Sequence, residues 1–229
     1  MKHINFAKLT LAVAAVLVIS SLAVAQQPLA IDNFSTGAYQ KTIKKGSDTH
    51  TETGTMLGDS RVTLFVSCPS VHCGEGGKGD NPYDQPSSID VKPLSQSTGI
   101  VILNSGYKTY TVLNLGYGYG LPMNEPLSPT YDRIRLNFDG SNQNINTNLY
   151  AYSGGDESTF GCWIVPPEFM QPFSVDIPFT DFSDPTVFGA LTNLNVVFGA
   201  AEGLNAEMEF GVTSIQAIPT GAPKAGSCN

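Results

Sequence analysis

The chain has 229 residues with 12 basic and 20 acidic side chains, so its formal net charge is −8. An acidic chain without a cluster of Lys and Arg argues against nucleic-acid binding and against attraction to anionic membranes. The charge is compatible with neutral ligands such as glycans, with cations, or with a surface whose charge simply maintains solubility.

Residues 1–25 have the pattern of a secretory signal peptide. Two lysines precede an apolar run over 9–22, and an Ala-Val-Ala sequence then provides a small-x-small cleavage site. We therefore expect a mature chain that starts at Gln26 and is secreted or periplasmic. A second long apolar run is absent from the sequence, so we expect no membrane insertion after cleavage.

The remaining chain reads as one domain over residues 26–218, followed by an irregular tail over 219–229. Its length suits a single β-sandwich or barrel and allows a full hydrophobic core to form without structural metals. We found no internal repeat and no linker long enough to divide it. The sequence therefore predicts one domain after the leader.

Alternating apolar and polar residues predict half-buried β-strands along most of this domain. In the clearest case Ile134, Leu136 and Phe138 alternate with polar neighbours. Similar patterns or short apolar runs predict strands over 49–56, 61–67, 100–103, 109–115, 173–179, 194–198 and 208–212. In the last strand the apolar phase slips after Val212, which predicts a β-bulge near Thr213-Ser214.

Helical periodicity is nearly absent. The one predicted helical turn starts at Pro185, with Asp184 as its N-cap. We expect residues 74–86, rich in glycine and proline, to form a surface loop, and residues 142–148 to be a loop leading into a strand. Together the patterns predict an all-β fold, a single antiparallel β-sandwich of jelly-roll type with very little helix.

Four cysteines, Cys68, Cys73, Cys162 and Cys228, predict two disulfides in an exported chain. Three pairings are possible. We favour Cys68–Cys73 with Cys162–Cys228, because closing a short loop costs little entropy and the second bridge would then tie the tail. A zinc site at Cys68, His72 and Cys73 is disfavoured, because a fourth ligand at a familiar spacing is missing.

Two stretches resemble a known superfamily. Ile31-Asp32-Asn33-Phe34 stands near the mature N-terminus, and Val175-Asp176-Ile177-Pro178 stands near the end of the domain. Together they resemble the opening and closing strands of the galactose-binding-like β-sandwich superfamily, which includes several carbohydrate-binding modules. The resemblance implies the same jelly-roll sandwich and says more about fold than about function.

The resemblance also raises the question of a structural calcium, the one cofactor we consider. Some of these modules have acidic residues in the closing strand near a calcium ion, whereas here that stretch reads Gly211-Val212-Thr213-Ser214. Asp32 and Glu209 are the remaining candidate metal ligands. Calcium needs six or more oxygen atoms, so two carboxylates make an incomplete set.

Tyrosines provide the candidate ligand-binding residues. Tyr117 and Tyr119 are two residues apart, as are Tyr150 and Tyr152, so each pair would share one face of a strand. Flat rings with hydroxyl edges suit the apolar faces of sugars. Asn144, Asn146 and Asn148 offer donors and acceptors nearby. Alternatively, these tyrosines pack at sheet edges or under loops, and Trp163 either joins them or packs against a disulfide at Cys162.

Catalysis is not expected. Gly58-Asp59-Ser60 resembles an esterase nucleophile motif, but the mature chain has only His50 and His72, and such enzymes need a later histidine. We therefore expect an exported non-catalytic protein with a structural or surface-interaction role, contacting another envelope or extracellular component. The alternative is a glycan-binding module that uses the tyrosines to hold a neutral glycan.

Overall fold

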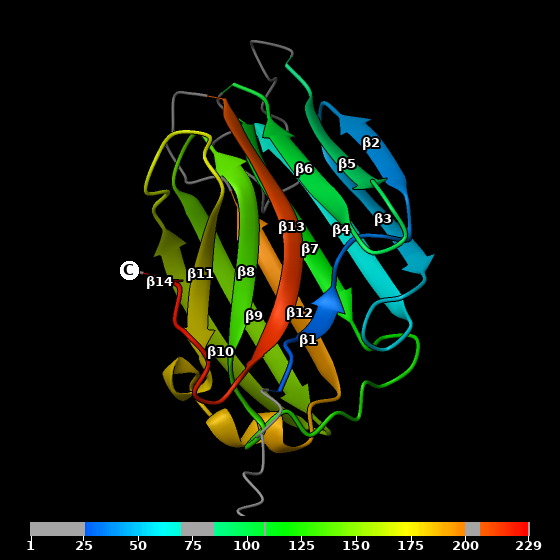
Figure 1. Ribbon diagram of the computed structural model, residues 1–229. Coiled ribbons are helices and arrows are strands. Elements are labelled where there is room, and N and C mark those ends of the chain that lie inside the picture. Colours follow the sequence, from blue (N-terminus) through cyan, green and yellow to red (C-terminus); the bar gives the residue numbers. More distant parts are fainter. Residues whose placement is uncertain (1–25, 70–84, 108, 200–206, 229) are drawn as a thin grey trace, which may run out of the picture.

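The computed structural model describes residues 26–69, 85–107, 109–199 and 207–228. The predicted signal peptide, most of the predicted 74–86 loop, and Cys73 with His72 lie outside these residues. The described chain folds as two β-sheets packed face to face (Figure 1). The predicted all-β sandwich is confirmed.

The larger sheet has eight strands in the order β14-β11-β8-β13-β6-β5-β2, with β1 also paired to β13. All of its pairs are antiparallel except β11 with β14. Its strands are β1 (Leu29–Asp32), β2 (Tyr39–Ile43), β5 (Ser87–Pro93), β6 (Gly99–Ser105), β8 (Tyr131–Ser141), β11 (Phe173–Pro178), β13 (Met208–Pro219) and β14 (Gly226–Ser227).

The smaller sheet has six antiparallel strands in the order β10-β9-β12-β7-β4-β3. Its strands are β3 (Gly46–Thr53), β4 (Ser60–Pro69), β7 (Thr109–Tyr117), β9 (Ile145–Ser153), β10 (Asp156–Ile164) and β12 (Asn193–Gly199). The predicted strand over 49–56 is therefore β3, which begins and ends three residues earlier.

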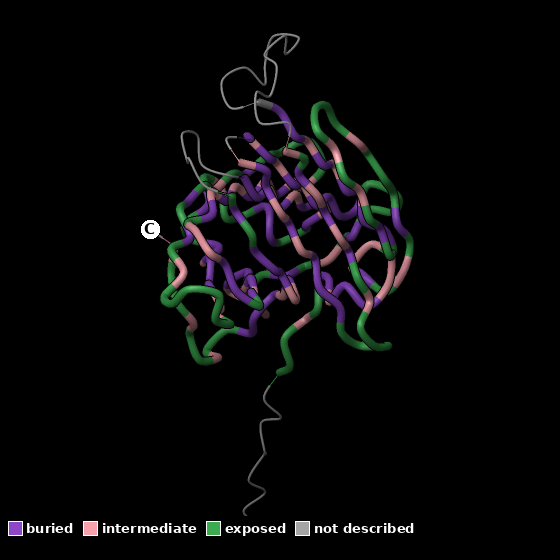
Figure 2. Tube along the Cα trace, turned by 90° about the horizontal axis from the view of Figure 1, so that it is seen from above, coloured by how far each residue is buried: buried purple, intermediate pink, exposed green. Residues whose placement is uncertain are grey.

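The hydrophobic core lies between the two sheets, because alternate residues of each strand point inward. Phe138 of β8 meets Phe198 of β12 edge to face, with ring centroids 6.1 Å apart. Figure 2 shows buried residues concentrated through the middle of the molecule and exposed residues in the peripheral loops. The alternation read from the sequence is thus the alternation between core and outer faces.

Two local predictions are confirmed. The register of β13 shifts between Val212 and Ser214, where the bulge was expected. Asp184 accepts a hydrogen bond from the Thr186 amide at the start of the 3-10 helix η2 (Pro185–Gly189). With the 3-10 helix η1 (Phe179–Asp181), η2 closes the lower end of the sandwich in Figure 1.

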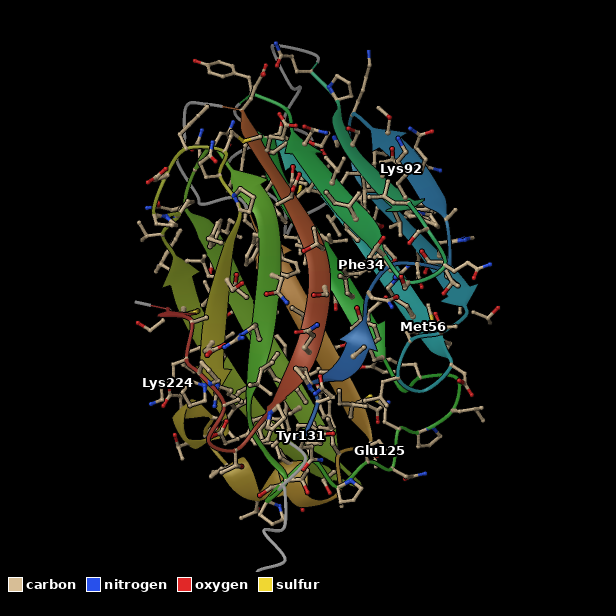
Figure 3. All side chains as sticks on the ribbon, in the orientation of Figure 1. Phe34, Met56, Lys92, Glu125, Tyr131 and Lys224 are labelled. Carbon is tan, nitrogen blue, oxygen red and sulfur yellow. A yellow bond between two sulfur atoms is a disulfide. The ribbon has the colours of Figure 1, made fainter. Side chains whose placement is uncertain are left out.

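The N-terminal motif that starts at Ile31 has a structural role. Ile31 and Phe34 are completely buried, and Figure 3 shows Phe34 just after β1. Asp32 forms a buried ion pair with Arg61 of β4, and the Arg61 guanidinium also lies 5.3 Å from the centre of the Phe34 ring. The residues that suggested the superfamily therefore hold β1 against the smaller sheet.

The motif at the other end secures the C-terminal tail. Asp176 of β11 pairs with Arg133 and Arg135 of β8 and accepts a hydrogen bond from the Ala225 amide. Both arginines also donate to the carbonyl oxygen of Pro223. The predicted irregular tail is therefore ordered along β11 and contains the short strand β14 (Figure 1).

The predicted Cys162–Cys228 disulfide is confirmed, with an S–S distance of 2.04 Å. It joins β10, an edge strand of the smaller sheet, to the residue after β14 at the edge of the larger sheet. Cys68 is also disulfide-bonded, while its predicted partner Cys73 lies outside the described residues.

Across the ranges that the structure describes, no helix is long and apolar enough to cross a membrane.

Candidate functional site

The candidate site is the surface of the six-stranded sheet that points away from the core, which we term the outer face. Along every strand, residues that point outward alternate with residues that point into the core, so the strand register defines which residues belong to the outer face. Its central members are Thr49, Thr51, Val62, Leu64, Val66, Val112, Asn114, Gly116, Asn193, Asn195, Val197, Asn146, Asn148, Tyr150, Tyr152, Glu157, Thr159, Gly161 and Trp163. Glu157 is the one charged residue in this set.

Tyr119 lies across this face just beyond the end of β7. The Nδ2 of Asn195 donates a hydrogen bond of 2.8 Å to the Tyr119 hydroxyl. A Cβ added at Gly116 would lie 2.9 Å from the Tyr119 ring and 2.8 Å from the Asn195 side-chain oxygen. Glycine at position 116 therefore makes the room in which the ring rests on the sheet, while about half of the side chain stays exposed.

A hollow of about 230 Å³ opens beside this ring. Its lining residues are Thr49, Val62, Leu64, Asn114, Gly116, Tyr119 and Asn195. Sites for drug-sized ligands usually measure about 300–1,000 Å³, so the hollow suits part of a ligand, such as one ring. The Oδ1 atom of Asn114 is buried there without a hydrogen-bond partner in the described part of the chain.

Tyr150 and Tyr152 lie on β9, on the same face and next to Asn195. Tyr150 is directly opposite Asn195 of β12. Burial raises the pKa of Tyr152, and the nearby negative charge of Glu157 and the Tyr119 side chain raise that pKa further. Three of the four predicted tyrosines therefore come together around one asparagine.

Tyr117 does not belong to this site, and the prediction that it shares a face with Tyr119 is wrong. Its side chain is completely buried and its hydroxyl donates a hydrogen bond of 3.1 Å to Asp32. Gly118 then adopts a positive φ of 84°, which turns the chain at the end of β7. Because the strand stops there, the two-residue spacing no longer places Tyr119 on the side of Tyr117.

The remaining polar and aromatic candidates are divided between the outer face and a turn. Asn146 and Asn148 lie on the outer face, whereas Asn144 lies in the exposed turn before β9. Trp163 is 43% exposed and lies on β10 opposite Asn146. Of the two alternatives for Trp163, the structure therefore favours a place on the same face as the tyrosines over packing against the disulfide.

The two proposed calcium ligands lie far apart. The carboxylate of Asp32 accepts hydrogen bonds from Arg61, Tyr117 and the Phe34 amide. Asp32 is opposite Ile215, six residues along β13 from the exposed Glu209, a distance of roughly 20 Å. These two carboxylates therefore do not share a site, and no cluster of three metal-binding side chains occurs among the described residues.

The sequence alone did not identify Asn114 and Asn195 as contributors to the hollow. Asn114 and Asn195 belong to strands β7 and β12, which are far apart in sequence but neighbours in the sheet. Each asparagine occupies an outward position within an apolar strand, which was the available signal. The strand order needed to bring them together cannot be read from that local pattern.

No protein-family model matches the sequence, and no curated protein matches it significantly. Among solved structures, the chain is similar to the family 11 carbohydrate-binding module of a cellulosomal cellulase of Clostridium thermocellum. That match has 12% identity and a TM-score of 0.42, and it covers 86% of this chain and 96% of the module. A family 11 module from Clostridium thermocellum in complex with a β-1,3-1,4-mixed-linked tetrasaccharide matches with 11% identity and a TM-score of 0.40. It covers 84% of this chain and 95% of that one.

A third similar structure, PfGH50B, matches with 10% identity and a TM-score of 0.33. The match covers 57% of this chain and 21% of that chain.

Proposed function

We propose that this protein binds a neutral glycan on the outer face of its six-stranded sheet, without transforming it. The observation that carries the proposal is the hollow beside Tyr119, whose ring is held over Gly116 by the Asn195 amide. An exposed ring held in a fixed position can stack on a sugar at a small entropic cost. The proposal therefore rests on geometry around Tyr119.

The chemistry of the surrounding surface also favours a neutral sugar. The hollow combines the apolar side chains of Val62 and Leu64 with the amides of Asn114 and Asn195. Sugars present the same combination, since their ring faces carry C–H groups and their edges carry hydroxyls. Amide side chains both donate and accept hydrogen bonds and therefore suit hydroxyl groups.

The distribution of charge points the same way. The whole chain carries a net charge of −8, yet the central outer face contains one charged residue, Glu157. A face without basic residues offers no ion pair to an anionic ligand. We therefore assign the site to uncharged carbohydrate.

We also propose that this binding takes place outside the cytoplasm. The leader pattern over residues 1–25 supports export. The Cys162–Cys228 bridge supports it as well, because disulfides persist mainly in oxidising compartments.

The direct test is binding of the mature protein to a panel of insoluble and soluble neutral polysaccharides, by pull-down and by affinity electrophoresis. Tyr119→Ala and Asn195→Ala should each weaken retention on any polysaccharide that the wild type binds. Phe169→Ala is the matched control for Tyr119, because Phe169 is 74% exposed and belongs to the loop between β10 and β11, where its neighbour Met170 is hydrogen-bonded to Ser141 of the larger sheet. Asn144→Ala is the control for Asn195.

Thermal melting of each variant separates loss of binding from loss of folding. If the wild type binds none of the panel, or if the two controls weaken binding as much as the site variants do, the glycan proposal is wrong. In that case the structural or surface-interaction role becomes the better interpretation.

A further inference from the structure

The outer face has a second aromatic surface at a distance from the hollow. Trp163 lies on β10 opposite Asn146, whereas Thr159 of the same strand lies opposite Tyr150. Four residues of an extended strand separate these two positions, or about 13 Å. A single sugar ring in contact with Tyr150 or with the hollow beyond it therefore cannot also contact Trp163.

The surface between the hollow and Trp163 carries short, uncharged residues. Asn146 and Asn148 of β9 point outward there, and Gly161 of β10 lies opposite Asn148. A Cβ added at Gly161 would lie 2.6 Å from the Asn148 side-chain oxygen, so the amide lies directly over this glycine. Glu157, the charged residue of the face, lies at the far end of β10 from Trp163. A chain of sugars could pass over these asparagines and find hydrogen-bonding groups along its path.

The strand that carries Trp163 is held in place from the other side. Its neighbour Cys162 points inward and is bonded to Cys228. Phe160 of the same strand packs on Phe182, with ring centroids 5.7 Å apart. Since Cys162 is fixed on the inside, alternation along the strand fixes Trp163 on the outside. The indole therefore lies on the outer face.

We infer that the ligand is a linear polysaccharide whose chain lies across β12, β9 and β10, in contact with both the hollow at Tyr119 and the indole of Trp163. This inference rests on the proposed function and specifies its substrate class as an extended polymer rather than a monosaccharide or a chain end. β10 is an edge strand, so the chain can continue past Trp163 beyond the sheet.

The test measures affinity for ladders of neutral linear oligosaccharides, namely cello-, xylo- and manno-oligosaccharides from disaccharide to hexasaccharide, by titration calorimetry. Wild-type affinity should rise with length and then level off. Trp163→Ala should lower affinity for the longest oligosaccharide by about tenfold, as expected for one stacked aromatic ring, and for the shortest by less than about twofold. Trp163→Phe should restore part of the gain, and Phe169→Ala should leave all affinities unchanged.

The outcomes separate the inference from the function on which it rests. If affinity does not rise with length, or if Trp163→Ala weakens all lengths equally, the polymer inference is wrong. Retained sensitivity to Tyr119→Ala would then leave glycan binding intact. If no oligosaccharide binds and Tyr119→Ala has no effect on polysaccharide retention, both fail. Melting temperatures close to the wild type show that the Trp163 variants are folded.

Discussion

The Nη1 atom of Arg61 lies 2.6 Å from the Oδ2 atom of Asp32, and both side chains are buried. Arg61 belongs to β4 of the smaller sheet, whereas Asp32 ends β1, which pairs with β13 of the larger sheet. Glu52 of β3 provides a second carboxylate 3.3 Å from Arg61, while the Nε atom of Arg61 has no partner in the described chain. This ion pair therefore joins the two sheets through charged groups inside the protein.

We predict that Asp32→Ala destabilises the protein by about 3–5 kcal/mol, because it leaves the buried Arg61 with an incomplete set of partners. Lys41→Ala is the matched control, since its pair with Asp48 is partly exposed to solvent and should contribute little to stability. Urea unfolding of both variants measures the difference. Equal losses would contradict the inter-sheet role of Asp32.

A second prediction concerns acid stability at Asp176. Burial alone would raise its pKa, but hydrogen bonds from Arg135 and the Ala225 amide, with the charges of two arginines, lower it below its ordinary value of 3.8. A carboxylate whose pKa is lowered by folding stabilises the protein above its unfolded pKa, and this contribution disappears as the pH falls through the folded pKa. The advantage of the wild type over Asp176→Asn should therefore be full near neutral pH and shrink below about pH 3.8.

Urea unfolding of the wild type and of Asp176→Asn at a series of pH values checks this. A stability difference that stays constant from neutral to strongly acidic pH would show that the carboxylate charge does not secure the tail.

The third prediction concerns the Cys162–Cys228 bridge, whose residues are 66 apart in sequence. In the chain-entropy picture, a loop of this length contributes about 4 kcal/mol by restricting the unfolded chain. Cys162→Ser should therefore lower the melting temperature more than Cys73→Ser, because the predicted Cys68–Cys73 bridge closes a much shorter loop. Comparable losses in thermal melts would contradict this order, as would free thiols in the native protein.

Much of the fold could be predicted because inward-facing residues recur at every second position. Ile134, Leu136 and Phe138 of β8 show this plainly, and so does the slip of phase that became the bulge after Val212. Strands β9 and β10 were harder to recognise, since their inward positions include Thr147 and Ser158, which weaken the apolar alternation. Polar residues that are buried look like surface residues in a sequence.

The candidate site could be predicted in part. Tyr150 and Tyr152 share a continuous strand, so the two-residue spacing placed them correctly relative to each other. The spacing failed for Tyr117 and Tyr119 because a glycine turn separates them. The role of Asn195 depends on β12 lying between β7 and β9, and strand order is a property of the whole fold. Local pattern therefore identifies residue types for a site, while topology decides which of them meet.

The last prediction separates two tyrosines that are two residues apart. Tyr117→Phe removes a buried hydroxyl that donates to Asp32 and should cost about 1.5–3 kcal/mol of stability, as for a hydrogen bond to a charged group. It should leave glycan retention unchanged, because the ring stays in the core. Tyr119→Ala should change stability by less than about 1 kcal/mol, since it affects an exposed side chain, but should strongly reduce retention.

Urea unfolding measures the stability of each of the two variants, and polysaccharide affinity electrophoresis measures the retention of each. Tyr117→Phe should lower stability and keep retention, whereas Tyr119→Ala should keep stability and lower retention. The Tyr117 hydroxyl donates to the ion pair between the sheets, and the Tyr119 ring lines the hollow on the outer face. Loss of retention in Tyr117→Phe at full stability, or retention by Tyr119→Ala equal to the wild type, would show that the ligand-binding surface lies elsewhere on the molecule.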